Sequence, residues 1–465
     1  MRLCTAVALL AAVLPCHAEP ALPESAIDQL VQKILVQTGV PSASIAVVRD
    51  KNVYAKAYGD ARLKPKTPAT AEMRYKIASN SKQIAATAIL LLAQDGKLSL
   101  DDSVARFLPT LTRAGEVTLR QLLSHTSGYQ DYYPLDYVAP FMARDTTAAQ
   151  ILDKWAKKPL DFDPGTRWQY SNTNYVIIGQ IIEKITGKPL IEFLRARIFS
   201  RLGMKSVIDV TNEHWSASDP VGHAQYALAP AHEATIEGNG WMYAAGELAM
   251  TARDLALWDT SLIEGRILKP ESLKALTTEV LLKGGSGTRY ALGLEVSTTA
   301  NGNRRWSHSG GAAGYFSRNT IFPDDKASIT VLTNGEGRAS GAIAQGIENL
   351  LFAATADPGA APALEHAKKL FTGLQNGALD RSLIDSDLTS YFTSEAIASF
   401  AASLKPLGAP QSFTAGPHED RGGYTVRDFS VKTATASLRI STYLTPGGKF
   451  AQFIVSRMPE DRPVQ

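Results

Sequence analysis

Apolar residues recur at helical spacing near the start of the chain, and two β-type runs follow them. A helix is predicted over residues 24–38, because polar residues separate its apolar positions at the period of an amphipathic helix. The apolar face carries Ile27, Leu30, Val31, Ile34 and Leu35. Residues 43–49 and 53–59 flank Asp50-Lys51-Asn52, and this arrangement predicts a β-hairpin.

Two longer apolar runs predict buried helices in the middle of the chain. Residues 84–93 are almost wholly apolar and end at Asp95-Gly96, where the glycine is expected to stop the helix. Residues 175–182 form the second run, which follows a turn signal at Asp163-Pro164-Gly165.

Further strands are expected after the helical region. They are predicted over residues 290–296, 304–307, 319–322 and 327–333. A helix over 342–352 closes this part of the chain. Strands at both ends with helices between them predict an α+β fold, in which one antiparallel sheet is flanked by helices and carries a helical insert over residues 90–270.

A second, smaller α+β domain is predicted at the C-terminus. Residues 353–364 are rich in Ala and Pro, and we place a linker at 356–364 between a domain at 19–355 and one at 365–465. The small domain is expected to contain helices over 365–376 and 394–405 and strands over 424–432, 436–443 and 450–457. It shows no catalytic motif, so we expect an accessory role in packing or substrate access, with a separate binding site as the alternative.

Composition excludes some functions and suggests a compartment. The formal net charge of the 465 residues is +3 without a basic stripe, which excludes nucleic acid as an expected partner. No Cys/His cluster with metal spacing and no phosphate-binding glycine loop is present, so we expect no metal or cofactor. Residues 1–18 have the features of a secretory signal cleaved after Ala18, and their apolar run is too short to span a membrane. The expected location is the bacterial periplasm or the cell exterior, with lipid attachment at Cys16 left open.

Ser79 and Lys82 lie in Ser-Asn-Ser-Lys, directly before the predicted buried helix. Positions i and i+3 share one face of a helix, so the lysine amine is expected beside the serine hydroxyl. A lysine desolvated near a helix start can lose its proton and act as a base for serine. The pair therefore predicts an activated nucleophile, and the alternative is a solvated helix face.

Tyr170 and Asn172 form the chain's Tyr-x-Asn motif, between the turn at 163–165 and the helix at 175–182. The tyrosine hydroxyl can relay a proton, and the asparagine amide can hold a substrate carbonyl and fix the lysine. The alternative is a capping cluster, because Ser171 and both neighbouring asparagines are good helix caps.

His308, Gly310 and Gly311 belong to a glycine-rich stretch that precedes two predicted strands. Glycines in a strand let a ligand approach the backbone, and the Gly311 N–H together with that of Ser79 can form an oxyanion hole. His308 is expected to place a substrate carboxylate or assist proton transfer. The sequence Lys283-Gly284-Gly285 competes with His308-Ser309-Gly310 for this role in the site. It is the weaker candidate because it lies in a glycine-rich hinge.

These three motifs, in this order, resemble those of the serine β-lactamase and DD-peptidase superfamily. The resemblance covers residues 25–355 and is strongest to the branch of class C β-lactamases, DD-carboxypeptidases and esterases. Two further stretches, 122–128 and 245–255, match sequence patterns that are usual in the family. His125, within the first of them, is interpreted as part of a helix end and turn that support the cleft.

The resemblance implies roles for the motif residues. Ser79 would be acylated, Lys82 would be its base, Tyr170 would shuttle a proton, and Asn172 would contact substrate and lysine. His308 stands where many members carry the lysine of Lys-Thr-Gly. This difference favours a D-amino-acid peptidase, carboxypeptidase or esterase over a β-lactamase proper. The substrate would be a small acyl compound or peptide, such as one derived from peptidoglycan. A penicillin- or peptide-binding sensor without turnover is the alternative from another class.

Overall fold

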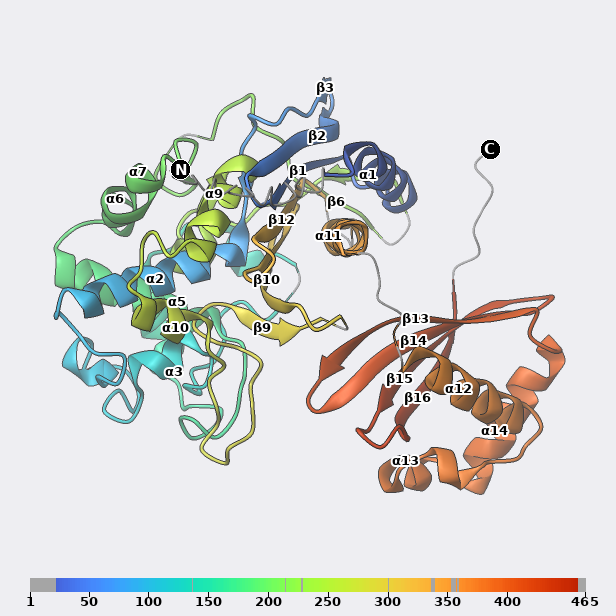
Figure 1. The fold of residues 1–465 in the computed structure, drawn as a ribbon. Helices are drawn as coiled ribbons and strands as arrows, with labels where there is room; N and C mark the ends of the chain where they lie inside the picture. Colours follow the sequence, from blue (N-terminus) through green and yellow to red (C-terminus); the bar gives the residue numbers. More distant parts are fainter. Residues whose placement is uncertain are drawn as a thin grey trace, which may run out of the picture.

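A computed structural model describes residues 22–458, except 136, 214, 227–228, 300, 336–338, 353–356 and 358. The predicted signal at 1–18 therefore lies outside the described residues. The chain forms a large unit with a seven-stranded antiparallel sheet and a small unit with a separate four-stranded sheet (Figure 1). Both sheets and their helices confirm the predicted α+β class.

The strands of the large sheet come from both ends of the large unit. In spatial order they are β3 (Lys66–Pro68), β2 (Asn52–Leu63), β1 (Ser42–Arg49), β12 (Ala327–Thr333), β11 (Tyr315–Phe322), β10 (Arg304–Ala312) and β9 (Glu295–Thr298). The pairing of β1 with β12, Ala43 opposite Thr333, joins the two ends of this unit. The predicted hairpin at 43–59 is confirmed as β1 and β2.

Alternating side chains give the sheet two buried faces. Ile45 and Val47 of β1 pack in one core with α1 (Glu24–Thr38) and α11 (Ala339–Leu351). Ala46 and Val48 point the other way, into the core shared with the helical region. Because side chains of a strand alternate in direction, burial on both sides explains the continuous apolar run of β1.

The helical region lies between β2 and β9 in the sequence, as predicted. Its helices are α2 (Ser81–Gln94), α3 (Leu119–Leu123), α4 (Ala148–Ile151), α5 (Asn172–Thr186), α6 (Leu190–Leu194), α7 (Ser200–Leu202), α8 (Tyr243–Gly246), α9 (Ala252–Ile263) and α10 (Pro270–Thr277). A small sheet there has the order β4 (Tyr75–Lys76), β8 (Leu248–Met250) and β5 (Ile208–Asp209), and β6 (His223–Ala224) pairs with β7 (His232–Glu233). Helix α2 is buried from Ser81 to Leu92, which explains its lack of a polar face.

Three predicted strands have different bounds in the structure, and the one expected at 319–322 begins already at Tyr315 as β11. The strand expected at 290–296 begins only at Glu295, because Tyr290 and Leu294 lie in an irregular segment whose side chains are buried. The strand expected at 304–307 continues to Ala312, so His308, Gly310 and Gly311 all belong to β10. Pairing with β11 extends β10 through its glycines, Gly310 opposite Ser317.

The small unit contains a meander of four strands rather than the predicted three. The sheet has the order β13 (Ser412–Arg421), β14 (Tyr424–Lys432), β15 (Ser437–Leu444) and β16 (Phe450–Arg457). Its helices are α12 (Ala360–Gln375), α13 (Ser386–Tyr391) and α14 (Ser394–Leu404), and residues from them share one core with the sheet. Helix α12 begins inside the segment 356–364 that we predicted as a linker. Strand β13 was missed because it carries Gly416, Pro417 and a run of charged residues.

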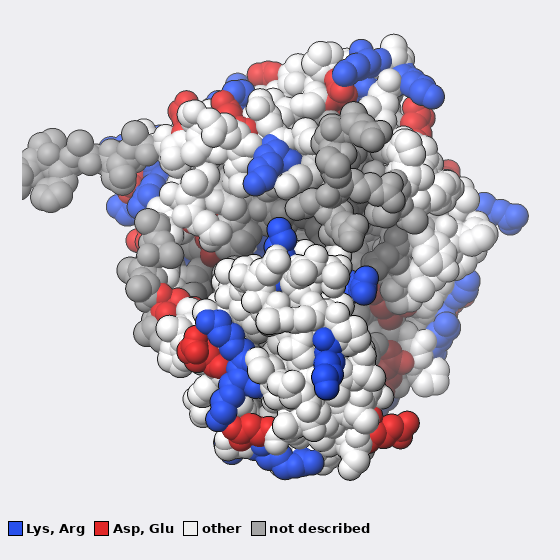
Figure 2. Space-filling model, turned by 90° about the vertical axis from the view of Figure 1, so that its right-hand side faces the viewer, with Lys and Arg blue, Asp and Glu red and all other residues white. Residues whose placement is uncertain are grey.

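Charges are scattered on the surface seen from the side of the small unit. On this face Lys and Arg lie apart from one another or beside Asp and Glu, with uncharged surface between them (Figure 2). Within the described ranges, no helix combines the length and apolar composition needed to cross a membrane.

Strand β10 passes so close to the segment before α2 that Gly310 has no room for a side chain. A Cβ on Gly310 would lie 2.3 Å from the Ile77 carbonyl oxygen and 2.3 Å from Ser317 Oγ. We expect Gly310→Ala to lower the free energy of unfolding by about 1–3 kcal/mol, as overpacked sites do. Urea unfolding followed by circular dichroism measures this change.

Gly341→Ala is the matched control, because a Cβ there meets no atom within 4 Å and the residue lies in helix α11. This variant should be as stable as the natural protein or slightly more stable. Equal stability of the two variants would show that the close approach at Gly310 is not a constraint.

Candidate active site

Ser79 lies at the junction of a short 3-10 turn, Ala78–Asn80, and helix α2. The residue before it, Ala78, has a φ of 48°, in the left-handed region that residues with a side chain rarely adopt. Gly246 of α8 packs against Ala78, and a Cβ there would lie 3.3 Å from the Ala78 carbonyl carbon. The strained turn therefore presents Ser79 to the cleft from a fixed backbone.

The amine of Lys82 is fully buried and has three hydrogen-bond acceptors from three parts of the chain. Its Nζ lies 3.0 Å from Ser79 Oγ, 2.8 Å from Asn172 Oδ1 and 2.7 Å from the Ala245 carbonyl oxygen. The structure thus brings the lysine beside the serine, as the motif spacing predicted. The alternative of a solvated helix face is wrong.

Burial changes the protonation of Lys82. Loss of solvent lowers its pKa to about 7, against a smaller attraction from the carboxylate of Asp131. A neutral amine keeps two N–H donors and one lone pair. When Asn172 and Ala245 accept those two N–H groups, the lone pair is left facing Ser79 Oγ.

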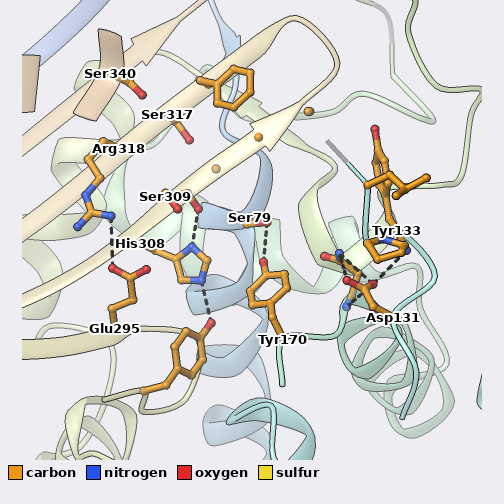
Figure 3. Close-up of a pocket in the computed structure, with 18 of the residues that line it drawn as sticks. Ser79, Asp131, Tyr133, Tyr170, Glu295, His308, Ser309, Ser317, Arg318 and Ser340 are labelled. Carbon is orange, nitrogen blue, oxygen red and sulfur yellow. Dashed lines mark hydrogen bonds and ion pairs between the residues drawn. The ribbon is translucent and has the colours of Figure 1, made fainter. Parts of the chain in front are cut away.

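Tyr170 reaches Ser79 from the segment just before α5, and its ring lies against Lys82, whose Nζ is 5.0 Å from the ring centroid. Its hydroxyl donates to Ser79 Oγ at 2.8 Å (Figure 3). Burial raises the pKa of Tyr170 above its ordinary value, so the phenol keeps its proton at neutral pH. Ser79 Oγ therefore contacts a weakly basic amine and a protonated phenol at the same time.

Asn172 is oriented by Asp131, a residue that the sequence analysis missed. The Asn172 backbone N–H and side-chain Nδ2 donate to Asp131 Oδ1 at 3.0 and 3.2 Å. With its nitrogen held there, the amide turns its oxygen toward Lys82. Ser171 makes no side-chain cap bond to helix α5, so the capping interpretation of this motif is wrong. The position of Asp131 in an aromatic-rich segment, 129–141, gave no sign of this contact.

His308 is held as a neutral ring with both nitrogens engaged. Nδ1 faces the Ser309 carbonyl oxygen, which only accepts, so Nδ1 carries the proton and Nε2 accepts from the Tyr290 hydroxyl at 2.8 Å. Burial lowers the pKa of His308 to about 4, against the attraction of Glu295. The ring therefore offers a substrate carboxylate neither a charge nor a free nitrogen, which argues against the placement role that we expected for it.

Gly310 and Gly311 lie on a stretch of β10 that has one open side. Strand β9 pairs with β10 only from Arg304 to Ser307, and β11 pairs with its other side as far as Ala312. The atoms nearest to a Cβ on Gly311 would be those of the Phe316 ring, the first at 3.3 Å. From His308 onward the edge of β10 toward β9 has no strand partner among the described residues, and this part of β10 lines the cleft.

A cleft of about 1550 Å³ joins the motif residues. Its lining includes Ser79, Tyr170, Asn172, His308, Gly310 and Gly311, together with Asp131, Tyr290 and Glu295, which the sequence did not single out. Lys283 is not part of the lining. His125 is fully buried behind it, 4.3 Å from Tyr170 between ring centroids, and its Nδ1 accepts from the Ser171 N–H, which agrees with a supporting position.

Among the residues that the structure describes, no group of three or more His, Cys, Asp or Glu side chains is placed to hold a metal ion. The polar groups at Ser79 are instead an amine, a phenol and an amide, which suit proton transfer and acyl transfer.

Comparisons with known proteins agree with the geometry. The chain is 27% identical over 367 residues to Penicillin-binding protein 4* of Bacillus subtilis (strain 168), covering 74% of this chain and 79% of that protein. A D-stereospecific amidohydrolase from Streptomyces sp. has a similar structure, with a TM-score of 0.62, 27% identity and coverage of 72% of this chain and 100% of that one.

A third protein shares the fold over most of both units. It is the octameric penicillin-binding protein homologue from Pyrococcus abyssi, with a TM-score of 0.65, 20% identity and coverage of 94% of this chain and 97% of that chain. The Beta-lactamase family model matches residues 27–353. The chain therefore belongs to the Beta-lactamase family and is a serine hydrolase of the β-lactamase-like type.

Proposed function

We propose that the protein hydrolyses amides or short peptides of D-amino acids through an acyl-enzyme on Ser79. The observation that carries this proposal is the contact of one hydroxyl, Ser79 Oγ, with both Lys82 Nζ and the Tyr170 hydroxyl. A serine needs a proton acceptor to attack a carbonyl, and the leaving amine needs a proton donor. The two neighbours of Ser79 supply one of each.

The first half-reaction follows from these contacts. Neutral Lys82 takes the proton of Ser79 while Oγ forms a bond to the carbonyl carbon. The backbone N–H groups of Ser79 and Gly311 stabilise the resulting oxyanion, and one such donor contributes about 3 kcal/mol to the lowering of the barrier. Tyr170 then protonates the leaving amine as the C–N bond breaks, and the Lys82 ammonium returns a proton to Tyr170.

The second half-reaction reverses these proton transfers with water. No other titratable group touches Ser79 Oγ in the described residues, so Tyr170 and Lys82 serve both steps. Water loses a proton to this pair and attacks the acyl carbonyl, and Ser79 Oγ leaves as the hydroxyl. Because both steps use the same two residues, their loss should stop the whole cycle.

The substrate class rests on two further points. The similar Streptomyces protein is a D-stereospecific amidohydrolase. His308 is neutral and fully hydrogen-bonded, so it gives no fixed charge for the carboxylate of a penicillin. Both points favour amide bonds of D-amino acids over β-lactams, and short-chain esters should react through the same acyl-enzyme.

Substitutions at Ser79 and Lys82 test the acyl-enzyme. Ser79→Ala should abolish labelling by a fluorophosphonate and lower kcat/KM by at least about a thousandfold, since the nucleophile is lost. Lys82→Ala should slow acylation by about 10²–10⁴-fold, since the hydroxyl loses its base. Lys97→Ala, an exposed lysine just beyond the end of α2, is the matched control and should keep full activity.

The pH dependence of acylation tests the protonation of Lys82. Only the neutral amine accepts a proton, and its fraction rises with pH through a pKa of about 7. The acylation rate should therefore increase about tenfold from pH 6 to pH 8 and level off above it. The rate constant for labelling by a fluorophosphonate in single-turnover experiments gives the profile. A rate that falls across this range would contradict the role of Lys82 as base.

A substrate panel separates turnover from mere binding. D-alanine amide, a D-Ala-D-Ala peptide, a nitrophenyl acetate and a chromogenic cephalosporin are compared by kcat/KM. We expect the D-amino-acid amides and the ester to be turned over and the cephalosporin to react most slowly. A penicillin adduct on Ser79 that persists in mass spectrometry, with no hydrolysis of any substrate, would instead identify a sensor.

A further inference from the structure

The C-terminal unit contributes residues to the wall of the active-site cleft. The cleft that contains Ser79 is also lined by Glu419, Asp420, Arg421 and Gly422, at the turn between β13 and β14. One end of the small sheet points toward the large unit, near β9 (Figure 1). The turn is thus the place where the second domain reaches the catalytic one.

The hairpin that carries this turn is well braced. Its last pair is Arg421 opposite Tyr424, and the two residues between them, Gly422 and Gly423, have φ values of 59° and 84°. Positive φ at both positions gives the tight two-residue turn that matches the twist of a hairpin. Arg421 also donates to the Tyr443 hydroxyl at 2.8 Å, which ties the tip to β15. The tip is therefore a fixed wall rather than a loose loop.

The catalytic unit contributes an arginine, Arg289, to the same cleft, and the acidic tip attracts it. Arg289 lines the cleft, is half-buried and has a φ of 55°. In the described part of the chain its guanidinium makes no ion pair within 4.0 Å; Asp420 attracts it most, followed by Glu279 and Glu419, and Arg421 of the same tip repels it. The attraction between Arg289 and the tip carboxylates thus stabilises the tip at the mouth of the cleft.

We propose that the β13–β14 turn is the outer wall of the active site and limits the size of the acyl or leaving group that reaches Ser79. This inference rests on the proposed acyl-enzyme at Ser79 for its substrate consequence. Small amides and esters pass the turn, whereas bulky or polymeric chains are excluded. The attraction between Arg289 and the tip carboxylates keeps the wall in place.

A shortened hairpin tests the wall directly. Deleting Asp420, Arg421, Tyr424 and Thr425 removes two cross-strand pairs, keeps the Gly-Gly turn and leaves Glu419 opposite Val426. The tip then withdraws by about 7 Å, at about 3.4 Å per residue, and every remaining side chain keeps its face. Circular dichroism and thermal unfolding show whether the full chain still folds.

Two fluorophosphonates of different bulk measure access to Ser79. In the shortened variant, labelling by a rhodamine-bearing probe should become at least tenfold faster, while labelling by a small ethyl fluorophosphonate should change less than twofold. An unchanged ratio of the two rates, or an equal change in both, would overturn the proposal.

Removal of the acidic charges tests the contribution of Arg289. Glu419→Gln/Asp420→Asn should speed labelling by the bulky probe at least threefold, because the attraction across the cleft is lost. Asp428→Asn is the matched control, since Asp428 pairs with Arg439 on the same sheet and does not line the cleft. An equal effect of the control would refute the role of the tip charges.

Thiol access decides the question even if Ser79 does not react. Ser309 is exposed and lines the cleft near Glu419, so Ser309→Cys, in a background with Cys4→Ser and Cys16→Ser, reports access to this wall. A fluorescein maleimide should react with it at least tenfold faster in the shortened variant, while iodoacetamide reacts at a similar rate in both. Failure of both fluorophosphonates with success here would reject the acyl-enzyme and keep the wall, and equal maleimide rates would reject the wall.

Discussion

The burial of the Lys82 amine beside Ser79 is the constraint on which the rest of the site depends. An ammonium taken out of water is costly unless polar partners surround it. The partners of Lys82 are the Ser79 hydroxyl from the 3-10 turn before α2, the Asn172 amide oxygen at the start of α5 and the Ala245 carbonyl oxygen of α8. The amine is therefore weakly basic and correctly aimed only while this turn, α5 and α8 keep their packing around α2.

Close helix packing explains several small residues around the lysine. A Cβ on Gly179 of α5 would lie 2.5 Å from the Tyr243 ring and 2.7 Å from the Ala244 side chain, at the start of α8. Gly293 packs similarly closely on the backbone of Lys82, since a Cβ on Gly293 would lie 2.8 Å from the Lys82 carbonyl oxygen. These contacts bring the acceptors within hydrogen-bond distance of the amine, so glycines remote from the chemistry determine the geometry of the base.

The two sides of the cleft differ in electrostatic character. On the helical side a titratable amine lies beside a carboxylate, Asp131, which holds the amide of Asn172. On the sheet side His308 is neutral, and the Arg318–Glu295 pair beside it is internally compensated (Figure 3). In the mechanism that we propose, the proton transfers are concentrated at Ser79, and the sheet contributes shape and backbone donors. Residues 419–422 of the C-terminal unit line the same cleft, and this is the basis of the role in substrate selection that we propose for the second domain.

The sequence by itself determined the local features of this protein. The spacing of Ser79 and Lys82 predicted their contact because residues three apart share a helix face. The apolar runs predicted α1, α2, β1 and β12 because the period and length of an apolar run depend on which side chains are buried. Contacts between distant segments were not encoded in any local pattern. Asp131 beside Asn172, Tyr290 beside His308 and the β13–β14 turn at the cleft all join segments whose proximity depends on how helices and sheets pack. Only the tertiary structure decided these contacts, because a hydrogen bond or a wall between remote residues requires the whole chain to bring them together.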